Sequence, residues 1–349
     1  MMRIALLLFA FCLIATAQRK PGSPLNQLPR NVQQLTYFGE RADFSPDGRR
    51  IGFMAKSFGD AFTVDLRTRT IRCLTCSVPG AAFLRVMHLT TGDYILIGPE
   101  RFTDIRTSRA RDNELWFLSK AAGARPVRFN QRMSEGAAIS KRSLKIAYSE
   151  TSAQNPDLPQ GASRLVTADI ELGAEPRLAN QKVVHESPDR SCVIEAQDFY
   201  DDDTKLTFSC YEPGDKAAVM SVDLETGAVT NHSQAAGTYN EPEGIFPGGK
   251  YTLVEADRHV YAWKEQGGHR TIDIYKMALD GTGKDYTRLT HFNDYDGWKA
   301  SNPVISNDGR YMAFQVAKTA DEAGVGYGIL LYRFGAQPAG KPSRSSLKR

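Results

Sequence analysis

The chain has 349 residues, of which 41% are hydrophobic and 24% are charged, with 29 glycines and 17 prolines. This ordinary globular composition excludes a disordered chain, a collagen and a coiled coil. The formal charge of +4 is small for this length and gives no case for a nucleic-acid partner. Two or three domains are usual at this length, but the sequence shows no domain break, which favours one domain built from repeats.

The first 17 residues have the pattern of a secretory signal peptide. Arg3 precedes an apolar stretch over residues 4–17, and Ala15-Thr16-Ala17 gives a small-x-small cleavage site. A helix of this stretch would reach about 21 Å, which is short of a hydrocarbon core of about 30 Å. We therefore expect a mature chain that begins at Gln18, has a charge of +3 after the loss of Arg3, and is periplasmic or secreted without a transmembrane segment.

A strand–turn–strand pattern recurs along the rest of the chain. Its clearest copies are DFSPDGRRIGF at 43–53 and ISNDGRYMAF at 305–314, with a further copy at 245–251. Pro and Asp favour the turn, Gly supplies a positive φ, and alternating apolar residues after the turn indicate a strand with one buried face. Weaker copies lie between these, and the equivalent turn positions are Gly48, Gly92, Ser143, Asp203, Gly249 and Gly309.

The turn positions are 44, 51, 60, 46 and 60 residues apart, so each interval can hold four short strands. Six such units predict an all-β fold, a six-bladed β-propeller of four-stranded antiparallel blades over residues 32–334. The segment 32–38 looks like an outer strand, whereas the last unit ends at 329–334 without one. We predict that 32–38 supplies the fourth strand of the last blade and closes the ring. The flanks are expected to be a linker (18–31) and a disordered basic tail (335–349).

The repeat resembles the TolB-type β-propeller repeat. The likeness rests on the Ser-Pro-Asp-Gly motif at 43–53, its copy at 305–314, and the strand, Asp-Gly turn and Leu-Thr ending at 272–290. It covers the propeller alone, without the α/β domain that precedes the propeller in TolB, and it implies an exported binding or scaffold module. Similar propellers occur in oligogalacturonate lyases and prolyl peptidases, so the fold alone does not choose between a binding module and an enzyme.

Four cysteines remain after cleavage of the signal peptide. Cys192 and Cys210 fall on either side of the acidic turn at 201–203 and predict a cross-strand disulfide, the alternative being two buried thiols. Cys73 and Cys76 form a CxxC at a strand end, where a local disulfide is expected. A redox centre is disfavoured because no helix N-terminus is there to lower a thiol pKa, and a zinc site would need two more ligands.

Functional residues are expected where the innermost strands of the blades enter the channel. The six units carry Glu40, Leu84, Glu135, Glu195, Glu241 and Ser301 at that point. Four glutamates in six units predict an acidic ring at the channel mouth, which would suit a cation, a basic ligand or sugar hydroxyls. The alternative is four solvated strand ends. The arginine-rich loop 101–113 is interpreted as a solvated charged loop rather than an anion site.

The loops of the fifth and sixth units add polar and aromatic candidates. Four further ligand-binding candidates are Tyr239, Glu243, Trp298 and Asn302. If the protein is an enzyme, its catalytic candidates are His259, Arg258, Glu241 and Lys299, which would have to meet in one closed pocket. The alternative is that His259 and Trp298 pack beneath long loops.

The sequence therefore predicts a monomeric, non-enzymatic module that binds an envelope protein or glycan through this face. The alternative function is a propeller lyase or hydrolase acting on acidic oligosaccharides. No GxSxG, HExxH or P-loop motif is present in the sequence, which disfavours a peptidase, a zinc hydrolase or a nucleotide enzyme. No cofactor is expected and no metal ligand is named, although a divalent metal at the channel mouth stays open.

Overall fold

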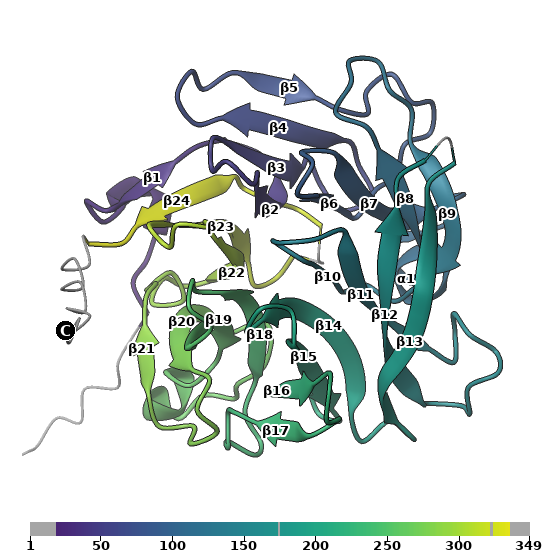
Figure 1. Ribbon diagram of the computed structural model, residues 1–349. Helices are drawn as coiled ribbons and strands as arrows, with labels where there is room; N and C mark the ends of the chain where they lie inside the picture. The colour runs from purple at the N-terminus through teal and green to yellow at the C-terminus, as the bar shows by residue number, and fades with distance from the viewer. Residues whose placement is uncertain (1–18, 174, 322–323, 336–349) are drawn as a thin grey trace, which may run out of the picture.

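The computed structural model describes residues 19–173, 175–321 and 324–335. Six four-stranded antiparallel sheets are arranged around a central channel as the blades of a propeller (Figure 1). The predicted six-bladed β-propeller is therefore confirmed. The predicted signal peptide (1–17) and residues 336–349 of the predicted tail lie outside the described residues.

The first three blades follow one another in the first half of the chain. Blade 1 contains β2 (Glu40–Phe44), β3 (Arg50–Met54), β4 (Ala61–Asp65) and β5 (Ile71–Cys73). Blade 2 contains β6 (Arg85–His88), β7 (Tyr94–Pro99), β8 (Asn113–Leu118) and β9 (Val127–Arg132). Blade 3 contains β10 (Ala137–Ile139), β11 (Lys145–Thr151), β12 (Ser163–Glu171) and β13 (Arg177–Ser187). In each blade the first strand is innermost, and the others pair outward in order.

The second half of the chain completes the ring. Blade 4 contains β14 (Val193–Tyr200), β15 (Lys205–Glu212), β16 (Lys216–Asp223) and β17 (Val229–Asn231). Blade 5 contains β18 (Asn240–Ile245), β19 (Tyr251–Ala256), β20 (Asp273–Ala278) and β21 (Tyr286–Arg288). Blade 6 contains β22 (Trp298–Ile305), β23 (Tyr311–Lys318) and β24 (Ile329–Arg333), and its fourth strand is β1 (Val32–Gln34).

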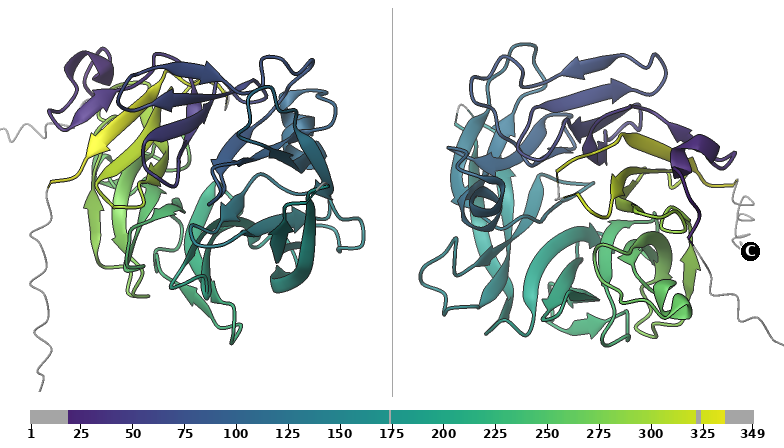
Figure 2. Two further views of the ribbon diagram at one scale, coloured as in Figure 1. Left: turned by 45° about the horizontal axis from the view of Figure 1, so that its top comes forward. Right: turned by 180° about the vertical axis from the view of Figure 1, so that it is seen from behind.

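The N-terminal strand closes the ring, as predicted from the sequence. β1 pairs antiparallel with β24, with Gln33 opposite Leu331, and the two strands lie side by side in Figures 1 and 2. Regular pairing ends at Gln34, although the backbone N–H groups of Leu35 and Thr36 still donate to the carbonyl of Ile329. The closing strand is thus shorter than the predicted 32–38, because the chain turns there toward blade 1.

Residues 19–31, expected from the sequence to be a linker, lie against blades 5 and 6. The backbone N–H of Lys20 donates to the carbonyl of Asp294 at 2.7 Å. The indole N–H of Trp298 donates to the carbonyl of Gly22 at 2.9 Å. The segment includes a short 3-10 helix, η1 (Pro24–Gln27), whose first turn is capped by the Ser23 side chain.

The inner strands are more deeply buried than the alternation of apolar and polar residues in the sequence predicts. Ile51 and Phe53 are fully buried as expected, but Gly52 and Met54 on the same strand are buried too. Each blade is covered on both faces by its neighbours, which is why the inner strands have two buried faces. Between blades 1 and 6, for example, Phe53 belongs to one apolar cluster with Ile329.

Helical structure among the described residues is confined to short turns. The loop 101–113 contains α1 (Ile105–Thr107) and the π-helical turn η2 (Ser108–Asp112), and blade 5 contains the 3-10 turn η3 (Val260–Trp263). Within that part of the chain, none of these is long and apolar enough to cross a membrane.

Both predicted disulfides are present. Cys73 and Cys76 are joined within one turn, with their Cα atoms 5.8 Å apart. Cys192 is joined to Cys210, with a Cα–Cα distance of 4.9 Å. The β14–β15 register places Ile194 opposite Cys210, so the bonded cysteines are diagonal neighbours rather than directly opposite.

Candidate functional site

The start of each inner strand brings polar residues to one mouth of the channel. In four blades the pairing of the first two strands is interrupted by a bulge, which lies after Glu40, Ala196, Pro242 and Ser301. Bulges break the strict alternation of side chains along a strand. Arg41 and Asn302 lie in two of these bulges with φ values of 54° and 48°. Both therefore face the channel together with the residues that precede them.

A cavity of about 410 Å³ opens at this mouth. We call it the upper cavity. All six blades or their loops contribute to its lining, which is dominated by charged groups and hydroxyls. Its carboxylates at the strand starts are Glu40, Glu135, Glu195 and Glu241, and the other lining groups of the deep part are Arg41, Arg85, Arg109, Tyr211, Tyr239, Glu255 and Lys299.

The structure brings the four glutamates of the predicted ring into this one cavity. They are shielded from water rather than solvated, since Glu40 is 1% exposed and the Glu135 side chain 13%. Gly136 makes the approach of blades 3 and 4 possible, because a Cβ atom there would lie 2.1 Å from Cγ of Glu195. The negative charge of this ring is partly compensated, because arginines form ion pairs with Glu40, Glu135 and Glu195.

Glu135 is held by two arginines. Nη2 of Arg109 donates to Oε1 of Glu135 at 2.7 Å, and Nη2 of Arg41 donates to the same oxygen at 2.5 Å. Burial works against ionisation, but the charges of Arg109, Arg41 and Arg85 outweigh it and hold the pKa of Glu135 well below its usual range. The loop 101–113 is thus not simply solvated as expected: its Arg109 reaches into the channel, although Arg106 and Arg111 remain exposed.

Glu195 experiences the opposite balance. Its contact with Arg85 is longer, at 3.7 Å. Burial and the negative charges of Glu135 and Glu241 raise the pKa of Glu195 to about 8. The cavity therefore holds a permanently ionised carboxylate and a carboxyl that titrates near neutral pH side by side.

Two tyrosines orient Glu241. The hydroxyl of Tyr211 donates to Oε1 of Glu241 at 2.5 Å, and the hydroxyl of Tyr239 donates to Oε2. Burial and the nearby glutamates raise the pKa of both phenols well above the usual value, so they stay protonated as donors. Beside them, the backbone N–H of Asn302 donates to Oε1 of Glu255, whose pKa is raised to about 8 by burial and by Glu241.

Lys299 reaches the same cavity from blade 6. Its Nζ atom donates to the carbonyl of His269 at 2.9 Å, and burial lowers the pKa of the amine. His269 lies on the more exposed rim, where its Nδ1 atom is 2.7 Å from a carboxylate oxygen of Asp215. The rim is completed by Arg270, Lys318 and Asp321.

The four catalytic candidates do not meet. Glu241 and Lys299 line the upper cavity, whereas His259 and Arg258 do not. Nε2 of His259 is 2.9 Å from Oδ1 of Asn293, and burial lowers the pKa of this imidazole to about 4. Arg258 lies over the ring of Tyr286, 3.4 Å from its centre.

The aromatic candidates also separate. Tyr239 lies in the upper cavity, but Trp298 packs at a ring distance of 5.6 Å against Tyr327 beneath the N-terminal segment. Trp298 therefore has the packing role that the sequence left open as the alternative. His259 does so too, with its Nδ1 atom 3.1 Å from the hydroxyl of Tyr275.

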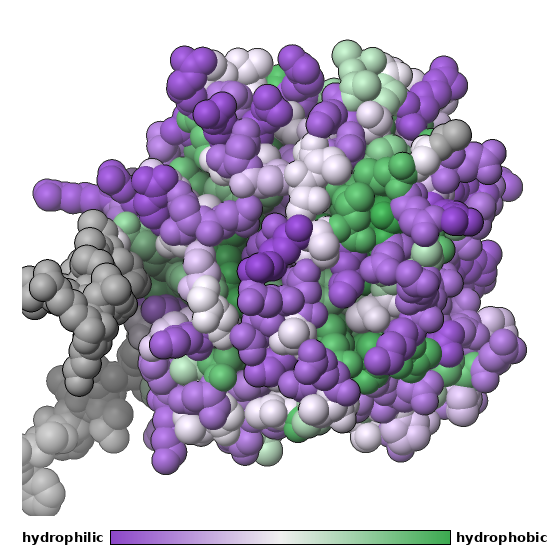
Figure 3. Space-filling model, in the orientation of Figure 1, coloured by the Kyte–Doolittle hydropathy of each residue, from purple (hydrophilic) through white to green (hydrophobic). Residues whose placement is uncertain are grey.

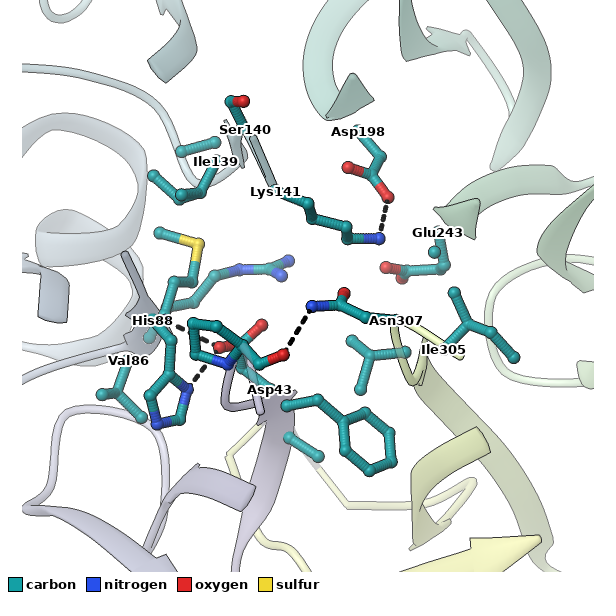
Figure 4. Close-up of a pocket in the computed structure, with 18 of the residues that line it drawn as sticks. Asp43, Val86, His88, Ile139, Ser140, Lys141, Asp198, Glu243, Ile305 and Asn307 are labelled. Carbon is teal, nitrogen blue, oxygen red and sulfur yellow. Dashed lines mark hydrogen bonds and ion pairs between the residues drawn. The ribbon is translucent and has the colours of Figure 1, made fainter. Parts of the chain in front are cut away.

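A second, smaller cavity of about 100 Å³ lies toward the other end of the channel (Figure 4). We call it the lower cavity. Asp43 pairs with His88 at 2.8 Å, Lys141 extends across to Asp198 at 2.9 Å, and the carboxylate of Glu243 points into the space. Arg41 and Arg85 line both cavities and therefore stand between them. On the face seen in Figure 1, hydrophilic residues cover the middle of the ring, with apolar patches to its right and below (Figure 3).

The sequence predicted Lys299 among the cations of the site but not its arginines, and it did not predict Glu255. Arg41 and Arg85 carried a usable signal, because they occupy the same repeat position, directly after Glu40 and Leu84. Arg109 belongs to the arginine-rich loop 101–113, which was interpreted as solvated because this insertion lies outside the repeat. Glu255 is at the end of the second strand of blade 5, away from the strand starts at which the repeat places the predicted glutamates.

Comparison with known proteins addresses the fold. No protein-family model matches the chain, and no curated protein matches it by sequence. Among solved structures, the proposed TolB of Agrobacterium tumefaciens aligns with a TM-score of 0.50 and 14% identity, over 78% of this chain and 97% of that one. TolB from Acinetobacter baumannii aligns with a TM-score of 0.45 and 14% identity, over 84% of this chain and 67% of that one. The fold is that of a TolB-like propeller.

The likeness to other propellers is equally one of architecture. Regucalcin, a calcium-binding protein from Agrobacterium tumefaciens, aligns with a TM-score of 0.52 and 11% identity, over 86% of this chain and 92% of that one. At such identities the shared feature is the fold, and the role of this TolB-like propeller has to be argued from its own residues.

Proposed function

We propose that this TolB-like propeller is a non-enzymatic binding module of the cell envelope, which receives a charged group of a partner in the upper cavity. One observation carries the proposal: fixed groups of both charge signs, supplied by all six blades, line a single open cavity of about 410 Å³. Such preorganised charges give specificity for a partner without a change of the protein's shape.

The rim of the upper cavity favours a protein over a glycan as the partner. Val325 lines the cavity and is 51% exposed, and Phe102 and Ile105 of the loop 101–113 are 42% and 38% exposed. Phe102 packs on Phe58, the residue after Ser57, whose hydroxyl donates to Glu40. Exposed apolar side chains beside a charged pocket are typical of protein interfaces. A charged side chain or chain terminus of the partner would then enter the cavity.

The compartment is supported by the two disulfides. Cys73–Cys76 and Cys192–Cys210 use all four cysteines of the expected mature chain, as in proteins of oxidising compartments. The predicted signal peptide leads to the same compartment. An export test would complete this part of the proposal: a reporter fused after residue 17 should be carried out of the cytoplasm.

Site-specific photo-cross-linking in cells tests the binding surface. A photoreactive amino acid at Val325 should yield a discrete adduct with one envelope protein, which mass spectrometry identifies. The matched control is Val229, which is 39% exposed on the outer strand β17 of blade 4. Equal adducts at both positions, or an adduct at Val229 alone, would contradict the proposal. If Val325 gives no protein adduct but acidic oligosaccharides raise the Tm of the protein, the partner is a glycan.

The alternative, a lyase or hydrolase acting on acidic oligosaccharides, has one observation in its favour. Glu195 and Glu255 have a pKa of about 8, and the pKa of Lys299 is lowered by burial, so these groups can exchange protons near neutral pH. Incubation with acidic oligosaccharides, followed by ultraviolet absorbance for unsaturated products and by a reducing-end assay, separates the two functions. Turnover that disappears in Lys299→Met would establish the enzyme, whereas the binding module should give none.

A further inference from the structure

Three glutamates in the channel form a group that differs from the rest of its charges. Glu241, Glu243 and Glu255 each offer a carboxylate oxygen, and these oxygens all lie within 4.8 Å of one another. All three residues are buried, with exposed fractions of 7%, 6% and 4%. Glu241 and Glu255 line the upper cavity and Glu243 the lower one, so the group lies between the two.

The other channel glutamates have cationic partners, and this group has none. Glu40 is 3.7 Å from Nε of Arg41, Glu135 binds Arg41 and Arg109, and Glu195 is 3.7 Å from Arg85. Within the described residues, no Lys, Arg or His nitrogen lies within 4.0 Å of a carboxylate oxygen of Glu241, Glu243 or Glu255. Lys299, which also lines the upper cavity, donates instead to a backbone carbonyl.

The charges of the deep channel leave the same deficit. Its carboxylates are Glu40, Glu135, Glu195, Glu241, Glu243 and Glu255, and its cations are Arg41, Arg85, Arg109 and Lys299. Among these described residues, six carboxyl groups thus face four cationic side chains.

Glu243 supplies the independent sign that a ligand is missing. Its Oε1 atom is buried and has no hydrogen-bond partner among the described residues. A buried carboxylate oxygen without a partner is costly and needs an explanation such as an ion. Its carboxylate points into the channel space in Figure 4.

We propose that Glu241, Glu243 and Glu255 bind one oxygen-preferring divalent cation, such as Ca²⁺, between the two cavities. Oxygen ligands bind Ca²⁺ at about 2.3–2.6 Å, so two ligands of one ion lie at most about 5 Å apart, as these oxygens do. The hydroxyls of Tyr211 and Tyr239 hold Glu241, and the backbone of Asn302 holds Glu255, in the way that outer groups orient metal ligands. The inference does not depend on the partner proposed above.

Thermal unfolding and calorimetry with the metal alone test the site. The mature chain, stripped with a chelator, is titrated with Ca²⁺, Mg²⁺ or Mn²⁺. We expect one of these ions at saturating concentration to raise the Tm by about 3 °C or more, with a stoichiometry near one by calorimetry. Glu243→Gln should abolish the shift and the heat of binding.

The matched control is Glu114→Gln, the same change at a buried glutamate of blade 2 that pairs with Arg128 outside the channel. It should leave the ion response intact. If Glu243→Gln does not fold, Glu255→Gln takes its place. Luminescence of bound Tb³⁺, excited through tyrosine, gives a readout that does not depend on stability, because Tyr211 and Tyr239 touch Glu241. The proposal is overturned if no ion changes the Tm or gives heat. It is also overturned if the response to the ion survives in both Glu243→Gln and Glu255→Gln.

Discussion

Two neighbouring buried carboxylates of the channel have pKa values that are shifted in opposite directions. Glu135 and Glu195 belong to adjacent blades and are both shielded from water. Two arginines in direct contact keep the pKa of Glu135 low, whereas the single, longer contact of Glu195 with Arg85 leaves its pKa raised to about 8. The number and distance of the arginine contacts, rather than depth, therefore decide which carboxylate is ionised.

Replacing Glu195 by glutamine should alter the pH dependence of stability. The pKa of Glu195 rises from 4.5 in the unfolded chain to about 8 in the folded protein, so the folded state binds its proton more tightly. The stability that this provides is complete below pH 4.5 and is lost as the pH rises through about 8. Glu195→Gln should therefore unfold at the same urea concentration as the wild type near pH 4. Near pH 9 its unfolding free energy should exceed that of the wild type by on the order of 4 kcal/mol.

Urea unfolding in the presence of a chelator measures this difference, and the exposed Glu225→Gln is the control that should show no such change. A variant that tracks the wild type at both pH values would mean that Glu195 is ionised throughout.

At this scale the sequence predicts four glutamates and Lys299 of the site but not the arginines that pair with the glutamates. The strand-start position in the repeat identified Glu40, Glu135, Glu195 and Glu241. This works because every inner strand runs in the same direction, so that all strand starts lie at the same mouth of the channel. The repeat did not identify the partners of these glutamates. Which arginine reaches which carboxylate depends on bulges, as for Arg41, and on loop insertions, as for Arg109, and neither leaves a periodic signal.

Among the elements, the hairpin of blade 4 confirms a cross-strand disulfide and adds its register. The acidic turn at 201–203 predicted that Cys192 and Cys210 lie nearly opposite each other. The bulge between Ala196 and Asp198 and the turn geometry instead make Cys192 and Cys210 diagonal neighbours. The disulfide forms all the same, because diagonal Cα atoms at 4.9 Å remain within bonding reach.

The two disulfides should contribute unequally to stability. Cys192–Cys210 spans a sequence separation of 18 and Cys73–Cys76 one of 3. By the loss of chain entropy in the unfolded state, these loops correspond to about 3 and about 1.6 kcal/mol. We expect the double serine variant at 192 and 210 to lose roughly twice as much unfolding free energy as the double serine variant at 73 and 76. Differential scanning calorimetry measures the loss of unfolding free energy in both variants. A larger loss in the variant at 73 and 76 would contradict this prediction and show that Cys73–Cys76 stabilises contacts beyond its own turn.

For the whole molecule, the closure of the ring is the feature that the sequence predicted best. The repeat gave the number of blades, and the missing outer strand of the last unit gave the role of β1. The packing of residues 19–31 on blades 5 and 6 was not predicted. Its proline-rich composition is typical of a linker, and its contacts are made with backbone groups such as the carbonyl of Gly22, which composition does not reveal.

Removal of residues 19–34 should open the ring. It would uncover the edge of β24, where Ile329 and Leu330 are fully buried, and remove the buried Val32. From the apolar area lost, we expect the Tm to fall by about 10 °C or more. A synthetic peptide of residues 19–38 added to the truncated protein should restore part of the Tm, whereas a scrambled peptide should not. An unchanged Tm after truncation would show that β1 does not close the propeller.

The charges of the upper cavity serve binding rather than folding if the proposed function is right. Replacing a buried ion pair by neutral residues of similar size is often neutral or stabilising. The triple variant Arg41→Met/Arg109→Met/Glu135→Gln removes Glu135 together with both arginines that hold it. With the photoreactive residue at Val325, it therefore tests the claim directly. We predict that the cross-linking yield falls at least tenfold while the urea midpoint stays the same or rises. A retained cross-link together with a lowered midpoint would contradict the account and make these charges part of the folded core.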